Sequence, residues 1–242
     1  MIINGDQTNA QRFISAYNVI DQTIRSVYNY KRNMTFSDMI RRTVPLNSII
    51  RKYEDKLIDF ARLRNSIIHN SNDEFIIAEP HDDVVRLMEK IANMISQPPK
   101  VIDSVARKNI LTITADVSIK NVVALMASSG FKNLPIYENG QILGIASPNR
   151  VIDWLGQKIE QEKIEKLLGT PISETLRESD TNVRFCICSE ELTVQEAIDK
   201  FFSNRILSTI IITKNGSKFD KISGIITVAD IMDLNKVIED YE

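Results

Sequence analysis

Near its C-terminus the sequence reads Gly224-Ile-Ile-Thr-Val-Ala-Asp-Ile231. Apolar residues after a glycine are typical of a buried strand, and Thr-x-x-Asp is typical of the start of a helix. The same frame occurs earlier as Gly144-Ile-Ala-Ser-Pro-Asn-Arg-Val151. Two such stretches in one chain indicate an internal repeat, so the residues around each stretch are expected to form the same order of strands and helices.

Each repeat is predicted to run strand, helix, strand, turn, strand, helix. Thr193 with Glu196 forms a capping-box pattern, and Ser118 occupies the equivalent helix start in the first repeat. Asn139-Gly140 and Asn215-Gly216 are hairpin-turn signals between the last two strands of each repeat. The expected strands therefore cover residues 110–114, 134–137 and 142–147 in the first repeat, and 184–188, 209–213 and 222–227 in the second.

The first 97 residues show no such repeat and are predicted to be helical. Apolar residues recur at intervals of three and four between Asn9 and Tyr30, and further helices are expected over about 36–42, 46–68 and 82–94. Pro98-Pro99 ends this region, because proline cannot continue a helix. The predicted fold class is an all-α bundle over 1–97 followed by two α+β domains over 98–165 and 166–242.

Composition restricts the class of protein. The formal net charge of −2 and a hydrophobic content of 43% are typical of a globular chain rather than a disordered one. No apolar run approaches the ~20 residues that span a bilayer, and the N-terminus does not resemble a signal peptide. The only cysteines, Cys186 and Cys188, cannot form a disulfide framework. We therefore expect a cytoplasmic protein without membrane association.

Charge is unevenly distributed along the chain. Residues 25–64 contain ten basic and four acidic side chains, a net charge of +6. Such a segment is either a solvated helical face or a surface for an anionic partner, and RNA is the candidate partner.

The repeated frame resembles a tandem pair of CBS domains, also called a Bateman module, over roughly residues 98–240. The resemblance implies a regulatory ligand that contains adenine: AMP, ADP, ATP or an adenine dinucleotide. It also implies that Thr227 contacts phosphate and that Asp230 holds the ribose hydroxyls. Independently of the resemblance, a helix start after a strand offers free N–H groups to a phosphate. The alternative is that Thr227 only caps a helix and Asp230 only complements its dipole.

The first repeat departs from this pattern. Arg150 stands where the acid would be, and Ser147 stands at the threonine position. Because arginine cannot accept hydrogen bonds from ribose, the first site is either empty or suited to additional phosphate bound by Arg150. Arg205 and Lys132 precede the central strands and are either phosphate partners or solvated. Thr181, Asn182 and Val183 match the position where the family wraps its backbone around the base.

The helical region contains Leu63-Arg64-Asn65-Ser66-Ile67-Ile68-His69-Asn70. This Arg-x4-His pattern resembles the signature of the HEPN superfamily, which includes metal-independent endoribonucleases. The resemblance implies that His69 exchanges protons, that Arg64 stabilises charge on the reacting phosphate, and that Asn65 assists beside it. Arg64 and His69 converge only if the helix ends near His69 or if a second subunit completes the site.

Two interpretations of the helical region remain open. In the first, it is a ribonuclease controlled by nucleotide binding to the CBS pair of a homodimer. In the second, it is a non-enzymatic region that dimerises or recruits a partner, in which Arg64 pairs with an acid such as Asp59 or Glu74. No metal-ligand spacing stands out in the sequence, so we expect no metal cofactor.

Overall fold

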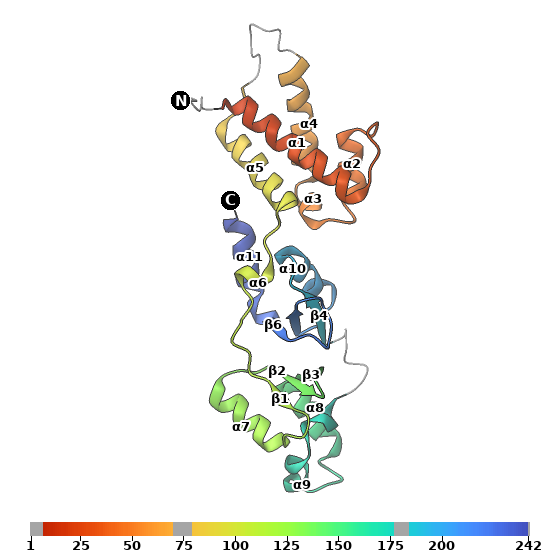
Figure 1. Ribbon diagram of the computed structural model, residues 1–242, viewed down its shortest axis with the longest axis vertical. Helices are drawn as coiled ribbons and strands as arrows, with labels where there is room; N and C mark the ends of the chain where they lie inside the picture. The colour runs from red at the N-terminus through yellow and green to blue at the C-terminus, as the bar shows by residue number, and fades with distance from the viewer. Residues whose placement is uncertain (1–6, 70–78, 177–183, 242) are drawn as a thin grey trace. The chain divides into compact units, whose positions relative to one another are not determined.

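The computed structural model describes residues 7–69, 79–176 and 184–241 (Figure 1). The chain divides into two compact units. One consists of residues 1–99 with residues 238–242, and the other consists of residues 100–237.

Helices build the N-terminal region, as predicted. They are α1 (Asn9–Tyr28), α2 (Phe36–Thr43), α3 (Ser48–Lys52), α4 (Glu54–His69) and α5 (Asp82–Ser96). The single helix expected over 46–68 is instead two, because Tyr53 leaves the helical conformation between α3 and α4. His81 caps α5, with Asp82 and Asp83 in the first turn where carboxylates complement the helix dipole.

The helical unit is held by an apolar core and by one polar link. The ring of Phe13 packs edge-on against Phe60, and Tyr17 stacks on Phe36 with ring centroids 4.3 Å apart. Arg12 on α1 makes two hydrogen bonds to Glu89 on α5, at 3.0 and 2.7 Å. The parallel pair α1 and α5 is therefore joined both by packing and by a bidentate ion pair.

The second unit contains two three-stranded sheets, each with one parallel and one antiparallel pair. The first sheet and its helices are β1 (Ile113–Thr114), α7 (Ile119–Ser129), β2 (Leu134–Glu138), β3 (Gln141–Ala146), α8 (Pro148–Lys158) and α9 (Ile164–Gly169). The second sheet and its helices are β4 (Phe185–Ser189), α10 (Val194–Ser203), β5 (Thr209–Thr213), β6 (Ile222–Thr227), a 3₁₀ turn η3 (Val228–Asp230) and α11 (Ile231–Asp240). The repeated order of elements and the predicted fold class are confirmed.

The two Asn-Gly pairs behave differently. Asn139 and Gly140 have φ values of 49° and 77° and alone join β2 to β3, as expected for a tight hairpin turn. Asn215-Gly216 instead lies in a longer connection over residues 214–221, where the backbone and side-chain amides of Asn215 bond to Asp220. The second pair correctly predicted where the chain reverses, but the expectation of a tight turn was wrong there.

Two connecting segments cross between the repeats: the segment that precedes each repeat in the chain packs against the sheet of the other repeat. The segment with α6 (Val101–Ser104) packs on the second sheet, where Arg107 and Ile225 exchange two backbone hydrogen bonds of 3.0 and 3.1 Å. The segment with the 3₁₀ turn η1 (Ile172–Thr175) packs on the first sheet, where the N–H of Ile172 donates to Val117 at 2.8 Å. Leu167 and Ile172 also belong to the core of the first repeat.

Candidate functional site

The second repeat places Thr227 and Asp230 together, at the point where β6 gives way to η3. The backbone N–H of Thr227 donates to Oδ2 of Asp230 at 2.7 Å, and the Thr227 hydroxyl donates to the same oxygen at 2.9 Å. The Asp230 side chain is only 6% exposed. The pair therefore forms a capping box that directs a buried carboxylate toward the end of the strand.

A third residue, Arg107, lies beside Thr227 and Asp230. We call the junction of strand and helix that carries these residues the corner of the repeat. Nη2 of Arg107 donates to Oδ1 of Asp230 at 2.8 Å, and the Arg107 side chain is 53% exposed. Backbone bonds to Ile225 fix the main chain of Arg107 beside β6. Sequence reasoning missed this residue because 123 positions separate it from Asp230 and only the crossing connector brings them together.

The corner is suited to a ligand that donates hydrogen bonds and carries negative charge. A carboxylate has about four lone-pair sites, and protein donors occupy three of those of Asp230. Of these three donors, only the Arg107 guanidinium belongs to a side chain that is about half exposed, at 53%. A diol could therefore compete for Oδ1 without breaking the capping box.

The equivalent corner of the first repeat is built differently. Ser147 caps α8, and its hydroxyl oxygen accepts a 3.4 Å hydrogen bond from the N–H of Arg150. Arg150 is only 6% exposed, and its Nη1 donates to the carbonyl of Thr175 at 2.9 Å. The structure thus directs this guanidinium to the backbone of the crossing connector that holds η1.

The remaining residues proposed for nucleotide binding are dispersed. Lys132 donates to the carbonyl of Met126 at 2.9 Å, near the end of α7. Arg205 is exposed between α10 and β5. Thr181, Asn182 and Val183 lie outside the described residues.

In the helical unit, Arg64, Asn65 and His69 all belong to α4, and His69 is its last residue. The Arg64 guanidinium lies 5.5 Å from the centroid of the Tyr17 ring, and its Nη1 donates to Asn65 Oδ1 at 3.5 Å. Burial raises the pKa of Tyr17 to about 12, so its hydroxyl stays protonated at neutral pH.

The acid pair considered for Arg64 is not formed with Asp59. Asp59 instead pairs with Arg62 at 2.9 Å, and Glu74 lies outside the described residues. Within the described part of the chain, the Arg64 Nε atom is buried without a hydrogen-bond partner. A buried guanidinium N–H that lacks a partner is unusual.

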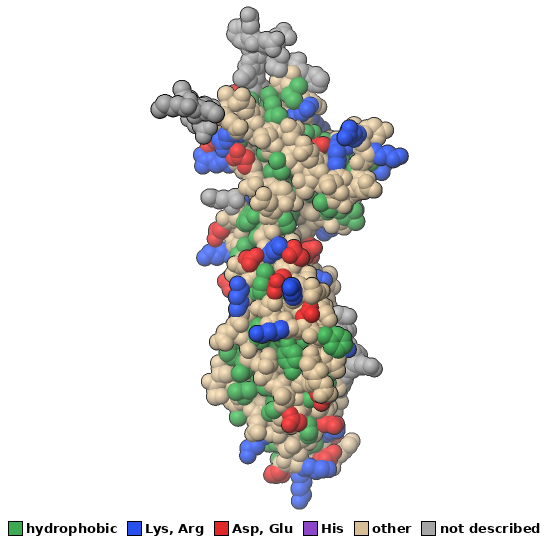
Figure 2. Space-filling view, viewed as in Figure 1, with side chains coloured by type: hydrophobic (Ala, Val, Ile, Leu, Met, Phe, Trp, Pro, Cys, Tyr) green, Lys and Arg blue, Asp and Glu red, His purple; other side chains and the backbone are tan. Residues whose placement is uncertain are grey.

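Several charges of the basic segment have structural roles. Arg51 donates to the carbonyls of Val44 and Pro45 beyond the end of α2, and Arg25 pairs with Asp21 at 2.7 Å. Figure 2 shows Lys and Arg side chains gathered at the edge of the helical unit near α2. Some basic side chains of this segment, such as Arg25 and Arg51, therefore stabilise the helical unit through hydrogen bonds and ion pairs. Others, such as Lys31 and Arg32, are exposed to solvent.

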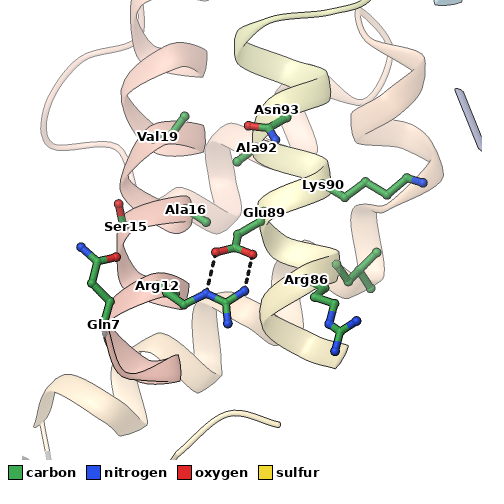
Figure 3. A pocket seen from close by; sticks show the side chains of 11 residues that line it. Gln7, Arg12, Ser15, Ala16, Val19, Arg86, Glu89, Lys90, Ala92 and Asn93 are labelled. Carbon is green, nitrogen blue, oxygen red and sulfur yellow. Dashed lines mark hydrogen bonds and ion pairs between the residues drawn. The ribbon is translucent and has the colours of Figure 1, made fainter. Parts of the chain in front are cut away.

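A hollow of about 720 Å³ lies between α1 and α5, lined on one side by Arg12 and on the other by Glu89 and Asn93 (Figure 3). The Arg12–Glu89 ion pair crosses it. Its described lining includes none of the residues that the sequence proposed for catalysis or nucleotide binding.

The described residues contain neither a metal-binding cluster nor a membrane-spanning helix. Over 7–69, 79–176 and 184–241, no three His, Cys, Asp or Glu side chains lie together so as to hold a metal ion. In the same ranges, no helix combines the length and apolar character that crossing a bilayer requires.

Comparison with known proteins identifies the second unit. Residues 101–157 and 181–236 match the CBS domain family, so residues 101–236 form a tandem CBS domain pair. The N-terminal helical region has no family assignment.

Individual relatives are distant. An uncharacterized protein of Methanocaldococcus jannaschii, MJ0188, is 26% identical over 76 residues, which is 31% of this chain and 27% of that protein. The chain thus matches about a quarter of the length of this curated relative. Protein MJ1225 of the same organism has a TM-score of 0.46 and 16% identity, covering 72% of this chain and 62% of that one. CBSX2, solved in complex with AMP, has a TM-score of 0.45 and 15% identity, covering 58% and 98%.

Proposed function

We propose that the CBS pair binds one adenine-containing nucleotide at Thr227 and Asp230, and that this ligand regulates the helical region. The observation that carries the proposal is the buried Asp230 carboxylate, held by Thr227 where β6 ends. A buried charge is costly unless it is paired and hydrogen-bonded, and the partner of Asp230, Arg107, has a side chain that is 53% exposed, which leaves a route for a ligand.

The chemistry follows from what each group accepts or donates. Asp230 would accept hydrogen bonds from the ribose hydroxyls, which are neutral donors that match an ionised carboxylate. Thr227 lies at the start of the helical segment that continues into α11, where N–H groups and the helix dipole favour phosphate. The preference for adenine is what the resemblance to CBS domains implies.

We propose a single site in each chain. The buried Arg150 of the first repeat offers donors but no acceptor, so it cannot hold a ribose as Asp230 would. Binding should therefore saturate at one nucleotide for each CBS pair.

Titration calorimetry with AMP, ADP, ATP and an adenine dinucleotide tests the proposal directly. We expect Asp230→Ala to weaken binding about tenfold or more, because it removes the acceptor of charge-assisted hydrogen bonds. Asp233→Ala is the matched control, since Asp233 is exposed one turn further along α11. Equal affinity of the parent and Asp230→Ala would overturn the assignment.

For regulation, the nucleotide must bind one arrangement of the protein more tightly than another. A homodimer in which paired helical regions realign is the arrangement we propose. Sedimentation with and without nucleotide would detect it as a change in mass or shape. An unchanged monomer under both conditions would contradict it.

A second candidate function, RNA cleavage by the helical region, is favoured by the Arg64 environment. Arg64 is not paired with Asp59, and it lies on the same helix as Asn65 and His69, which ends at His69. In this mechanism the ribose 2′-hydroxyl attacks the adjacent phosphorus and the 5′-oxygen leaves, with His69 moving a proton and Arg64 stabilising the charge on phosphate.

Incubation of the full chain with varied RNAs, with and without adenine nucleotides, tests this second candidate. We expect His69→Ala to abolish cleavage, whereas His81→Ala, at the exposed start of α5, leaves it unchanged. Equal rates for the parent and His69→Ala would favour the alternative in which the helical region only dimerises or recruits a partner.

A further inference from the structure

We infer that Arg107 is a specificity-determining residue that leaves Asp230 when a nucleotide binds and pairs with the ligand's phosphate. It would make the site select phosphorylated nucleosides over free nucleosides. This inference rests on the proposed function of the same site, and it assigns to Arg107 a role that the sequence repeat does not indicate.

The backbone of Arg107 is fixed, whereas its guanidinium is held by a single ion pair to Asp230 and belongs to an exposed side chain. Its backbone N–H donates to Ile225 at 3.0 Å and its carbonyl accepts from Ile225 at 3.1 Å, so its Cα is fixed beside β6. Its side chain is 53% exposed, whereas the Asp230 side chain to which it bonds is 6% exposed. The guanidinium can therefore swing about a fixed anchor while the carboxylate stays in place.

The ligand and Arg107 compete for the same oxygen. Thr227 occupies Oδ2 of Asp230 with two donors, and Arg107 occupies Oδ1. One lone-pair site of Oδ1 is left, so a ribose that presents two hydroxyls to this carboxylate needs the site that Arg107 occupies and must displace the guanidinium. The hydroxyls keep the buried carboxylate hydrogen-bonded after Arg107 has left.

Displacement leaves a guanidinium close to the bound ligand, and what it meets depends on the ligand. A 5′-phosphate is an anion that can accept two parallel N–H bonds from the planar guanidinium. A nucleoside offers no such group, so its binding exchanges an ion pair for hydration of Arg107. Removal of the side chain should therefore weaken the binding of phosphorylated ligands without weakening that of nucleosides.

The first repeat lacks this device among its described residues. Arg150 is buried and donates to the Thr175 carbonyl, which is a neutral backbone acceptor of the connector. The exposed cation next to an acceptor for ribose is therefore specific to the second repeat.

Calorimetry of the full chain with adenosine, AMP and ATP tests this inference. For Arg107→Ala we expect affinity for AMP and ATP to fall about tenfold or more, because a charge-assisted pair is lost. Affinity for adenosine should stay the same or rise, since adenosine no longer displaces the guanidinium. Lys108→Ala is the matched control, because Lys108 is an exposed cation at the next position and should leave all three affinities unchanged.

Two further variants guard against a trivial loss of structure. Arg107→Lys keeps a cation without the planar fork and should lie between the parent and Arg107→Ala. Arg107→Gln keeps a hydrogen-bond donor to Asp230 and should still lower the ratio of AMP to adenosine affinity.

The outcomes separate the two levels of the proposal. A parent chain that binds none of the nucleotides overturns the proposed function and this inference with it. A parent that binds AMP or ATP, with Arg107→Ala weakening adenosine and nucleotide equally or weakening neither, overturns the inference alone.

Discussion

The two repeats close the same corner with opposite polarity. In the second, the repeat supplies an acid, Asp230, and the crossing connector supplies an arginine, Arg107. In the first, the repeat supplies an arginine, Arg150, and the connector supplies a carbonyl acceptor at Thr175. The residue Arg150 is 6% exposed in the first corner, whereas the side chain of Arg107 is 53% exposed in the second. Among the described residues, the second corner thus has the polar contact that a ligand in solution can reach and replace.

The largest effect should come from giving the first repeat the acid of the second. Arg150→Asp replaces the buried guanidinium with a carboxylate beside the Thr175 carbonyl, which among the described residues is an acceptor and cannot pair with it. An unpaired buried charge costs about 3–5 kcal/mol, so we expect a loss of that order in the free energy of unfolding. Urea denaturation followed by circular dichroism would measure it.

Arg150→Met is the control for this change, because it preserves most of the buried stem without introducing a charge. It should cost less, about 1–3 kcal/mol, from the unsatisfied Thr175 carbonyl and the altered packing. If Arg150→Asp were as stable as the parent and bound a second nucleotide, the two corners would be interchangeable and the comparison would fail.

The paired glycines of the repeated frame should differ next. A Cβ on Gly224 would lie 2.8 Å from Ile102 Cδ1 and 3.0 Å from the Cβ of Ala106, which has no side-chain torsion that could move it away. A Cβ on Gly144 would meet mainly the flexible end of Leu176 at 2.7 Å. We expect Gly224→Ala to destabilise by about 1–3 kcal/mol and Gly144→Ala by less than about 1 kcal/mol.

Thermal unfolding of the two glycine variants, measured in parallel, would test this order. Equal losses of unfolding free energy would contradict it. They would mean that the connector with α6 shifts away from residue 224 as easily as the Leu176 side chain shifts away from residue 144.

A smaller difference is expected between the turns. Gly140 and Gly216 both have φ of 77°, a conformation that costs an alanine about 1–2 kcal/mol. At Gly216 the new Cβ would also lie 3.2 Å from the backbone nitrogen of Ser189, whereas at Gly140 nothing lies within 4 Å. Gly216→Ala should therefore lower the unfolding free energy more than Gly140→Ala, as measured by urea denaturation. The reverse order would indicate that the long connection relaxes more readily than the tight turn.

Local features of both repeats could be predicted from sequence because they depend on neighbours in the chain. The capping box of Thr193 and Glu196 and the tight turn at Asn139-Gly140 are of this kind, and both are present. The break at Tyr53 carries no glycine or proline and could not be anticipated. Arg107 and the carbonyl that binds Arg150 depend on connectors that cross between the sheets, so no spacing within one repeat reveals them.

The smallest effect on stability concerns a pair of thiols that only the second repeat carries. Cys186 and Cys188 lie on β4 with their sulfurs 3.9 Å apart. The hydrogen bond from Cys186, with the charge of Lys200 nearby, lowers the pKa of Cys188 from 9.0 to about 7, and the same hydrogen bond and burial raise that of Cys186. Only one of the two should therefore ionise near neutral pH.

The signs of the two pKa shifts set the pH dependence. The lowered pKa of Cys188 stabilises the folded state at pH values above 9.0, the pKa of this thiol in the unfolded chain. This contribution is lost as the pH falls from about 9 through about 7. The raised pKa of Cys186 contributes stability that is complete below its unfolded value of 9.0 and is lost only as pH rises well above it. Between pH 7 and 9 folding should thus strengthen slightly with pH, while the thiolate of Cys188 becomes the reactive group.

Alkylation with iodoacetamide at a series of pH values, read by mass spectrometry of the folded chain, measures this directly. We expect half-maximal reactivity of Cys188 near pH 7 and much slower reaction of Cys186. Cys186→Ala removes the thiol that is hydrogen-bonded to Cys188, so the midpoint for Cys188 should move up toward 9.0, its ordinary value. A midpoint that stays near 7 in this variant would assign the lowered pKa to Lys200 rather than to the neighbouring thiol, and Lys200→Ala would then be the variant that raises it.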